Sequence, residues 1–284
     1  MFDFIGIPMG YVLRFLAGLV GNNFAAAVLV FTVLINLLMI PLTVKSQKSS
    51  VGQMRIRPKL DELKAKYGDD RQGYSLAMQE LYQKENVSMS GGCLPMLLRM
   101  VFMMAVYSVI NNPLRFMCGV DNKLITDAIA AKIADTPMKL LAVVQQGGVE
   151  TIPASALDGV DFTLFGISLT ETPSIGNPSL VWIFPFLAFA AQMITSVISM
   201  KIQKMQNPDA PNMAGMMLTM PVMSLIIGFS FPAALGFYWA VSALITGAIQ
   251  TIVSLNYGPA VIIAKEQAND VYARYKKENN RKAN

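Results

Sequence analysis

Arg99 is the one charged residue in an apolar stretch that runs from Asn86 to Leu114. A guanidinium near the middle of a membrane span costs roughly 2.5–3.5 kcal/mol on insertion scales, so its presence there indicates a function. No Asp or Glu lies inside the other apolar stretches of the chain, so a buried carboxylate partner is not expected. A water-filled cavity is then the better way to hold the charge, and the attraction of anionic groups is the chemistry it would supply.

Thr32 and Asn36 are the second polar feature, because residues four apart share one face of a helix. Asn36 precedes the end of its apolar run at Thr43, and Arg99 follows the start of its own run at Cys93. At 1.5 Å per residue both lie roughly 9–11 Å inside the membrane, measured from these ends of the two runs. The two runs therefore predict a shared polar patch that opens to one side of the membrane. Taken singly, a polar residue in a span more often hydrogen-bonds another helix than binds a ligand.

Catalytic chemistry has few candidates in this chain. The absence of histidine excludes Ser-His and Cys-His catalytic pairs and His-dependent zinc sites. No G-x-x-x-x-G-K-[ST] motif marks a phosphate-binding loop, and the two cysteines lack metal-ligand spacing. We therefore expect a protein that is not an enzyme and that holds no cofactor and no metal.

The elements that must position these residues are membrane spans. The chain is 54% hydrophobic and only 14% charged, whereas a soluble domain has about 25% charged residues. Uncharged runs cover residues 15–44, 172–200 and 210–264, and the last is long enough for two helices of about 20 residues. With the Arg99 stretch, these runs predict an all-α integral membrane protein with five transmembrane helices. We place the spans at about 24–43, 93–113, 179–200, 213–230 and 234–255.

The distribution of Lys and Arg predicts the orientation of the spans. Nine basic residues lie in segment 45–92 and six follow residue 256, whereas loop 114–178 has four basic residues and seven acids. Because the basic side of a membrane protein is normally cytoplasmic, we expect the N-terminus outside and the C-terminus inside. The polar patch around Arg99 would then open to the cytoplasm.

Two segments outside the spans are predicted to be helical. Residues 1–20 read as an amphipathic helix in the outer membrane interface. Residues 45–90 read as a cytoplasmic helical hairpin with its turn at 68–70, although a simple solvated connector would carry the same charges. The interfacial helix has an apolar stripe formed by Phe4, Ile7, Tyr11, Phe15 and Leu19.

The remaining segments are less regular. Loop 114–178 is extracytoplasmic; it is expected to be helical as far as Gly147 and Gly148, with an apolar part near 160–173 at the membrane surface. Residues 257–284 form a weakly basic cytoplasmic tail, which we expect to be disordered.

Four motifs resemble a known family: "LLMIPLTVKSQKS" (37–49), "GGCLPMLL" (91–98), "LFGISLT" (164–170) and "FPAALGFYWAVS" (231–242). Together they resemble the YidC/Oxa/Alb membrane protein insertases, in the short five-span form of Gram-positive bacteria. The resemblance implies a five-helix core over residues 21–256, around a hydrophilic groove open to the cytoplasm and to lipid. It also implies a multi-pass protein of the bacterial plasma membrane that inserts nascent membrane proteins. The implied partners are these clients, membrane lipid, the ribosome and the Sec translocon, without sequence-specific nucleic acid.

One departure from the family concerns the charge. The resemblance implies a basic residue where this chain has Asn36, and a neutral residue, often glutamine, where it has Arg99. The positive charge has therefore moved to the facing wall of the implied groove. The expected groove residues are Arg99, Asn36, Thr32, Gln192, Trp239 and Ser242, of which Trp239 matches a family aromatic residue. Two alternatives stay open: a secondary transporter or channel for an anionic substrate, and a membrane-embedded assembly scaffold.

Overall fold

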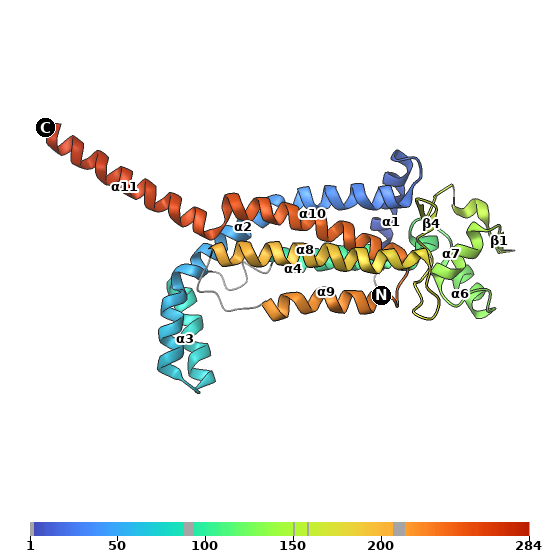
Figure 1. Cartoon of the computed structure of the whole chain (residues 1–284), viewed down its shortest axis with the longest axis horizontal. Coiled ribbons are helices and arrows are strands. Elements are labelled where there is room, and N and C mark those ends of the chain that lie inside the picture. Colours follow the sequence, from blue (N-terminus) through green and yellow to red (C-terminus); the bar gives the residue numbers. More distant parts are fainter. Residues whose placement is uncertain (1–2, 88–93, 150, 158, 207–213, 284) are drawn as a thin grey trace. The chain divides into compact units, whose positions relative to one another are not determined.

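The computed structural model describes residues 3–87, 94–149, 151–157, 159–206 and 214–283. The fold is mostly helical, as expected, and the elements are drawn in Figure 1. In chain order they are α1 (Asp3–Leu19), α2 (Phe24–Tyr67), α3 (Arg71–Lys84), α4 (Leu94–Asn111), α5 (Pro113–Phe116), α6 (Asn122–Ala130), α7 (Pro137–Gln145), β1 (Gly148–Val149), β2 (Ile152–Pro153), η1 (Ala154–Leu157), β3 (Thr163–Leu164), β4 (Ile167–Ser168), η2 (Leu180–Trp182), α8 (Ile183–Gln206), α9 (Ala214–Gly228), α10 (Ala233–Tyr257) and α11 (Pro259–Ala283).

Three helical stretches of the described residues are long and apolar enough to cross a membrane: Phe24–Tyr67, Leu180–Gln206 and Ala233–Lys276. The shorter apolar helices among them are Phe4–Leu19, Leu97–Asn111 and Met217–Gly228. Each of the five predicted spans thus coincides with an apolar helix, although only three have full length among the described residues. The predicted start of the second span at 93 and of the fourth at 213 lies outside the described residues.

The chain divides into two compact units. The first comprises Met1–Leu38, Arg99–Ile198 and Asn212–Ala248, and the second comprises Met39–Leu98, Ser199–Pro211 and Ile249–Asn284. The first unit contains the main hydrophobic core, in which the rings of Phe24 and Phe162 lie 5.0 Å apart. This core joins the start of α2 to the loop between β2 and β3, so residues far apart in the sequence are buried together.

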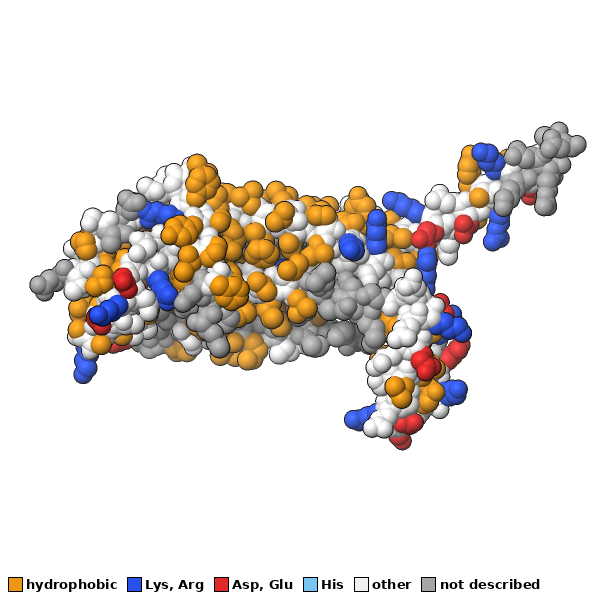
Figure 2. Space-filling model, turned by 180° about the vertical axis from the view of Figure 1, so that it is seen from behind, with side chains coloured by type: hydrophobic (Ala, Val, Ile, Leu, Met, Phe, Trp, Pro, Cys, Tyr) orange, Lys and Arg blue, Asp and Glu red, His pale blue; other side chains and the backbone are white. Residues whose placement is uncertain are grey.

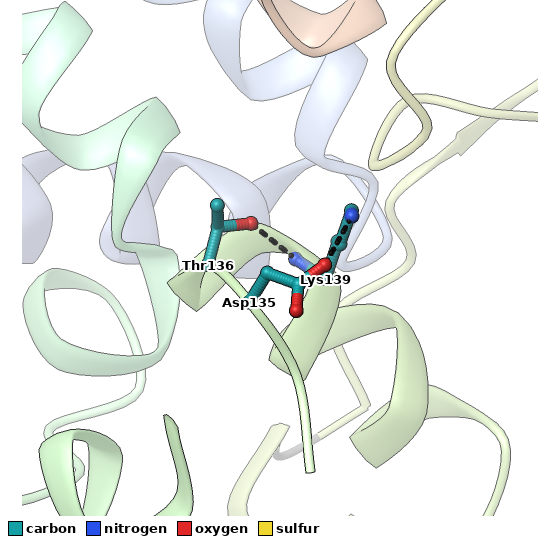
Figure 3. A network of polar contacts seen from close by, with 3 residues as sticks. All are labelled: Asp135, Thr136 and Lys139. Atoms are coloured by element: carbon teal, nitrogen blue, oxygen red, sulfur yellow. Dashed lines mark hydrogen bonds and ion pairs between the residues drawn. The ribbon is translucent and has the colours of Figure 1, made fainter. Parts of the chain in front are cut away.

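Loop 114–178 is a folded cap in the first unit. Its expected single helix is two helices, α6 and α7, because Pro137 starts the second and Thr136 caps it by accepting a hydrogen bond from the Lys139 amide at 3.2 Å. Lys139 also forms an ion pair of 2.6 Å with Asp135, which lowers the pKa of this carboxyl (Figure 3). The apolar faces of both helices are buried in the main core through Ile125, Ala128, Met138, Leu140, Leu141 and Val144.

The helix α1 packs through glycine. A Cβ atom on Gly10 would lie 1.9 Å from the Phe116 carbonyl oxygen, and one on Gly6 would lie 2.8 Å from the Phe116 ring. Leu13 and Ala17 continue this buried face. The predicted apolar stripe of α1 lies elsewhere and is exposed throughout; it comprises Phe4, Ile7, Tyr11, Phe15 and Leu19.

The second unit contains the helical hairpin. α2 continues without interruption past the predicted end of its span, through Pro41 and Pro58, to Tyr67. Gly68, with φ of 50°, begins the turn, and Asp70 caps α3 by accepting a hydrogen bond from the Gly73 amide at 3.0 Å. The end of α3 returns to α2, where Lys59 forms an ion pair of 2.6 Å with Glu85. The hairpin is therefore antiparallel, as predicted.

The tail is helical, so the expected disorder is wrong. α11 begins at Pro259, and an ion pair between Arg55 and Glu266 joins it to α2 within the second unit. A proline at the first position and good helix formers in the body of the segment, such as Ala, Lys and Glu, explain the helix. In Figure 2 hydrophobic side chains cover much of the helical face drawn, while Lys, Arg, Asp and Glu lie on the hairpin, on α11 and on loop 114–178.

Candidate functional site

The side chain of Asn36 joins two helices of the first unit. Its Nδ2 donates a hydrogen bond to the Thr32 carbonyl oxygen at 2.9 Å, and its Oδ1 accepts one from the Thr246 hydroxyl of α10 at 2.8 Å. Asn36 is 6% exposed, so these bonds are shielded from solvent. A buried amide with both ends bonded fixes the distance between α2 and α10.

Thr32 is buried on the same face of α2. Its hydroxyl donates to the Val28 carbonyl oxygen at 2.7 Å, one turn earlier on its own helix. This bond satisfies the hydroxyl locally and makes no contact with another helix. Thr32 and Asn36 therefore belong to one polar column on α2, and of the two only Asn36 hydrogen-bonds another helix among the described residues.

Thr246 is a site residue that the sequence reasoning missed. It lies four residues after Ser242 and four before Gln250, so the three share one face of α10. That polar spacing within an otherwise apolar helix was the signal available in the sequence.

Arg99 lies on the side of α4 that packs inward. At 3.6 residues per turn it shares a face with Phe102, Val106 and Val109, of which the last two are buried. The opposite face of α4 carries the exposed Leu97 and Val101, whereas Met103, one turn after Arg99, is also exposed at 43%. Arg99, itself half-buried, thus lies at the edge of the protein-facing side of the helix.

The guanidinium of Arg99 is half-buried. Its Nε atom is buried and has no hydrogen-bond partner among the described residues. No ion pair between described residues includes this side chain either. A guanidinium offers five N–H donors, so this group retains donors for an anion or for water. No hydrogen bond among the described residues joins Arg99 to Asn36, and their facing arrangement stays a prediction.

Trp239 lies where α10 meets α8. It packs against a small cluster formed by Ala188, Ala191 and Ala240, and its ring lies 6.4 Å from that of Phe231. Phe231 in turn contacts Tyr107 of α4 edge-on at 5.8 Å. An aromatic series therefore links α10 to α4 within the first unit.

Small residues bring α8 and α10 close together. A Cβ on Gly247 would lie 2.4 Å from Thr195 Cγ2, and a Cβ on Gly236 would lie 3.1 Å from Phe184 Cβ. Gln192 is half-buried on α8, beside Ala191, and the hydroxyl of Ser242 hydrogen-bonds that of Tyr238. The structure thus places all six predicted groove residues in the first unit, and it brings Asn36 together with Thr246 and Trp239 together with α8.

The described residues form no metal-binding centre. Nowhere in that part of the chain do three His, Cys, Asp or Glu side chains come together as metal ligands would. The arrangement offers a cation that pairs with no described residue, beside apolar helices, and a buried amide that holds two of them.

Known proteins are similar to this chain over most of its length. Residues 15–259 match the family described as 60 kDa inner membrane protein. The membrane protein insertase YidC 2 of Listeria innocua serovar 6a is 27% identical over 247 residues, which are 86% of this chain and 68% of that protein. The membrane protein insertase YidC of Allorhizobium ampelinum is 31% identical over 260 residues, 90% of this chain but 36% of the relative. Anaeromyxobacter dehalogenans has a YidC that is 44% identical over 102 residues, 18% of its length.

Proposed function

The chain belongs to the 60 kDa inner membrane protein family, the family of the YidC insertases, and from this premise we propose that it inserts nascent membrane proteins into the bilayer. It is a membrane protein whose apolar helices are long enough to cross a bilayer. It spans about two thirds of the Listeria relative and about one third of the Allorhizobium one.

The observation that carries the proposal is the half-buried Arg99 at the edge of the protein-facing side of α4, which has no ion pair with any residue that the structure describes. A fixed cation with free donors attracts the acidic or polar tail of a client segment. Its surroundings are apolar, so the Coulomb attraction is stronger than in bulk water. A hydrophilic groove that opens to the cytoplasm would let this tail enter part-way into the membrane, with Arg99, Gln192, Trp239 and Ser242 along it.

Asn36 and Thr32 have a different part in this proposal. Both are buried and bonded, but only Asn36 links α2 to α10, while Thr32 bonds within α2; together they would form the groove wall from within. The client's hydrophobic segment then leaves sideways into lipid. Each central Leu or Phe contributes roughly 0.3–0.6 kcal/mol to that transfer, so one span supplies the driving force without any covalent chemistry.

The membrane arrangement that we propose has five spans: the first part of α2, then α4, α8, α9 and α10. The 18 residues of α4 extend about 27 Å and the 15 of α9 about 22 Å, against a hydrocarbon core of about 30 Å. The basic hairpin and α11 lie in the cytoplasm, and the cap of residues 114–178 lies outside with α1 in the outer interface. The exposed apolar stripe of α1 supports this position.

Sidedness has a direct test. Cysteines introduced singly at Gln79 of α3 and Thr126 of α6, both exposed, are expected to react with a membrane-impermeant maleimide from opposite sides of the membrane. Reaction of both from the same side would overturn the topology.

The basic surface of the hairpin suits a polyanionic partner. Ribosomal RNA and anionic lipid both fit its charge, and the Sec translocon is a further partner at the membrane. None of these contacts requires a sequence-specific nucleic-acid reader.

The activity is tested by reconstituting the purified full chain in liposomes with a small single-span client. We expect protease-protected insertion of the client, measured against protein-free liposomes. Flux of an anionic solute without insertion would favour the transporter or channel, and neither activity would favour the scaffold. Either result would overturn the insertase proposal.

A further inference from the structure

Phe165 occupies an unusual position at the tip of the β3–β4 hairpin. The strands pair with Leu164 opposite Ile167, so Phe165 and Gly166 form a two-residue loop. Both residues have positive φ, 51° and 79°, as in a type I′ turn. Such turns favour Asn-Gly, because a bulky side chain is sterically disfavoured in the left-handed region. Phe165 is also 95% exposed, so no packing within the described chain compensates for this strain.

We propose that Phe165 is a membrane anchor whose ring enters the lipid headgroup region at this end of the protein. The occupant of this apolar tip is therefore lipid and not a second protein. Aromatic rings are favoured at the membrane–water interface. Such a location would account for a phenylalanine at a position where exposure of the ring to water and the positive φ of the turn are both unfavourable.

The base of the hairpin lies at the ends of two apolar helices. The Asp161 amide donates to the Asn22 carbonyl oxygen at 2.8 Å, and the Phe24 amide donates to the Asp161 carbonyl oxygen at 2.9 Å. On the other strand, the Ala234 amide of α10 donates to the Leu169 carbonyl oxygen at 2.9 Å. The hairpin is therefore fixed to the start of α2 and of α10, where apolar helices reach a bilayer surface.

The distance from that surface is short. Phe165 follows Asp161 by four residues, so the tip lies at most about 13 Å from the base at 3.3 Å per residue. The headgroup layer on each side of the hydrocarbon core is about 5–8 Å thick. The tip can therefore reach this layer without any change in the hairpin.

The charges on the hairpin support lipid as the occupant. No charged residue lies between Asp161 and Glu171, which stand at the base of the two strands. The same unit exposes large apolar side chains at other elements, including Phe4 and Phe15 of α1 and Leu180 of η2. An uncharged tip is thus part of a unit that already presents apolar surface to the bilayer.

The test measures depth with an environment-sensitive fluorophore on a single cysteine. Phe165→Cys and the control Thr126→Cys, on the exposed face of α6, are made in full chains that carry Cys93→Ser and Cys118→Ser. The labelled proteins are reconstituted in vesicles of phosphatidylglycerol and phosphatidylethanolamine. We expect a lipid nitroxide at a shallow acyl position to quench the label at Phe165→Cys at least about twofold more than the control label. Aqueous iodide should show the reverse order.

Equal quenching of both labels by iodide would place the tip in water and overturn the proposal. Failure of both quenchers at Phe165→Cys would place it against protein and also overturn it. The unlabelled Phe165→Asn chain separates anchoring from folding. Asn adopts the left-handed region readily, so its thermal midpoint in detergent should equal or exceed that of the parent. A lower midpoint would show that Phe165 supports the fold, against the proposal.

Discussion

The hydrogen bond between Thr246 and Asn36 gives the sharpest stability prediction. Thr246→Val keeps the shape of the side chain but leaves the Asn36 Oδ1 buried without its donor. An unmet buried acceptor costs about 1–3 kcal/mol in proteins generally. Hydrogen bonds between membrane helices average about 0.6 kcal/mol, because the unfolded chain in lipid also finds partners. We therefore expect a loss of about 1 kcal/mol, or about a fivefold change in the unfolding equilibrium.

The assay is SDS-driven unfolding from mixed micelles, applied to a double-mutant cycle of Thr246→Val and Asn36→Leu. The matched control is Thr32→Val on α2, which is buried more deeply than Thr246 but bonds only the Val28 carbonyl oxygen of its own helix. Its removal leaves no buried group unpaired, so a change below about 0.5 kcal/mol is expected. If Thr246→Val destabilises no more than this control, or the coupling in the cycle is near zero, the bond does not hold α2 to α10.

Three further predictions follow from close approaches and charge. Gly10→Ala should release α1 from Phe116 and so raise the rate of amide exchange in α1. The control Gly18→Ala, whose added Cβ would lie no nearer than 4.0 Å to another packed atom, should leave that rate unchanged. Similar exchange rates in both variants would contradict the close packing of α1 on Phe116. Gly247→Leu should destabilise the chain by about 1–3 kcal/mol in the same micelle assay through its clash with Thr195, and a neutral result would show that α8 and α10 are not closely packed. Lys59 lowers the pKa of Glu85. This pair should therefore stabilise the hairpin at every pH above the usual Glu pKa of about 4.3, and the stabilisation should be lost as the pH falls through the lowered pKa. Amide exchange of α3 should show this pH dependence in the parent and lack it in Lys59→Ala; its persistence in the variant would contradict the assignment.

The apolar helices and the hairpin were predictable because their signals are local. Uncharged runs and the Lys and Arg distribution identify apolar helices, and Gly68 with Asp70 marks the hairpin turn directly. The continuation of α2 beyond residue 43 into the hairpin was not predicted, because a charge boundary near residue 44 resembles the end of a helix. Proline is tolerated in membrane helices when neighbouring groups satisfy the freed backbone.

The folded cap was only partly predictable, because its stability depends on contacts across the sequence. Phe162 is buried against Phe24, which precedes it by more than 130 residues, and no local pattern announces such a pair. The break between α6 and α7 was readable in principle from Thr136 and Pro137, a capping residue followed by proline.

The candidate site shows the same division. Arg99 was identified from its type and surroundings alone, since a lone charge in an apolar run needs an explanation. The partner of Asn36 was not, because which face of α10 meets α2 depends on tertiary packing. The packing also changes the interpretation of Asn36. This residue is 6% exposed and bonded at both ends, so we interpret it as a link within the groove wall and not as a contact for the client.

The central claim is that the charge of Arg99 draws acidic client segments into the membrane. At an effective dielectric of about 20, a cation and a carboxylate about 8 Å apart attract by about 2 kcal/mol, enough for about a 30-fold effect. The direct measurement is the insertion rate, in liposomes, of two clients that differ only in an acidic or a neutral tail. It compares the parent with Arg99→Ala, Arg99→Lys and the control Arg115→Ala. We predict that Arg99→Ala slows the acidic client about tenfold or more and the neutral one much less, while Arg99→Lys and Arg115→Ala retain most of the parent's rate. Equal rates for both clients in the parent and in Arg99→Ala would contradict the account.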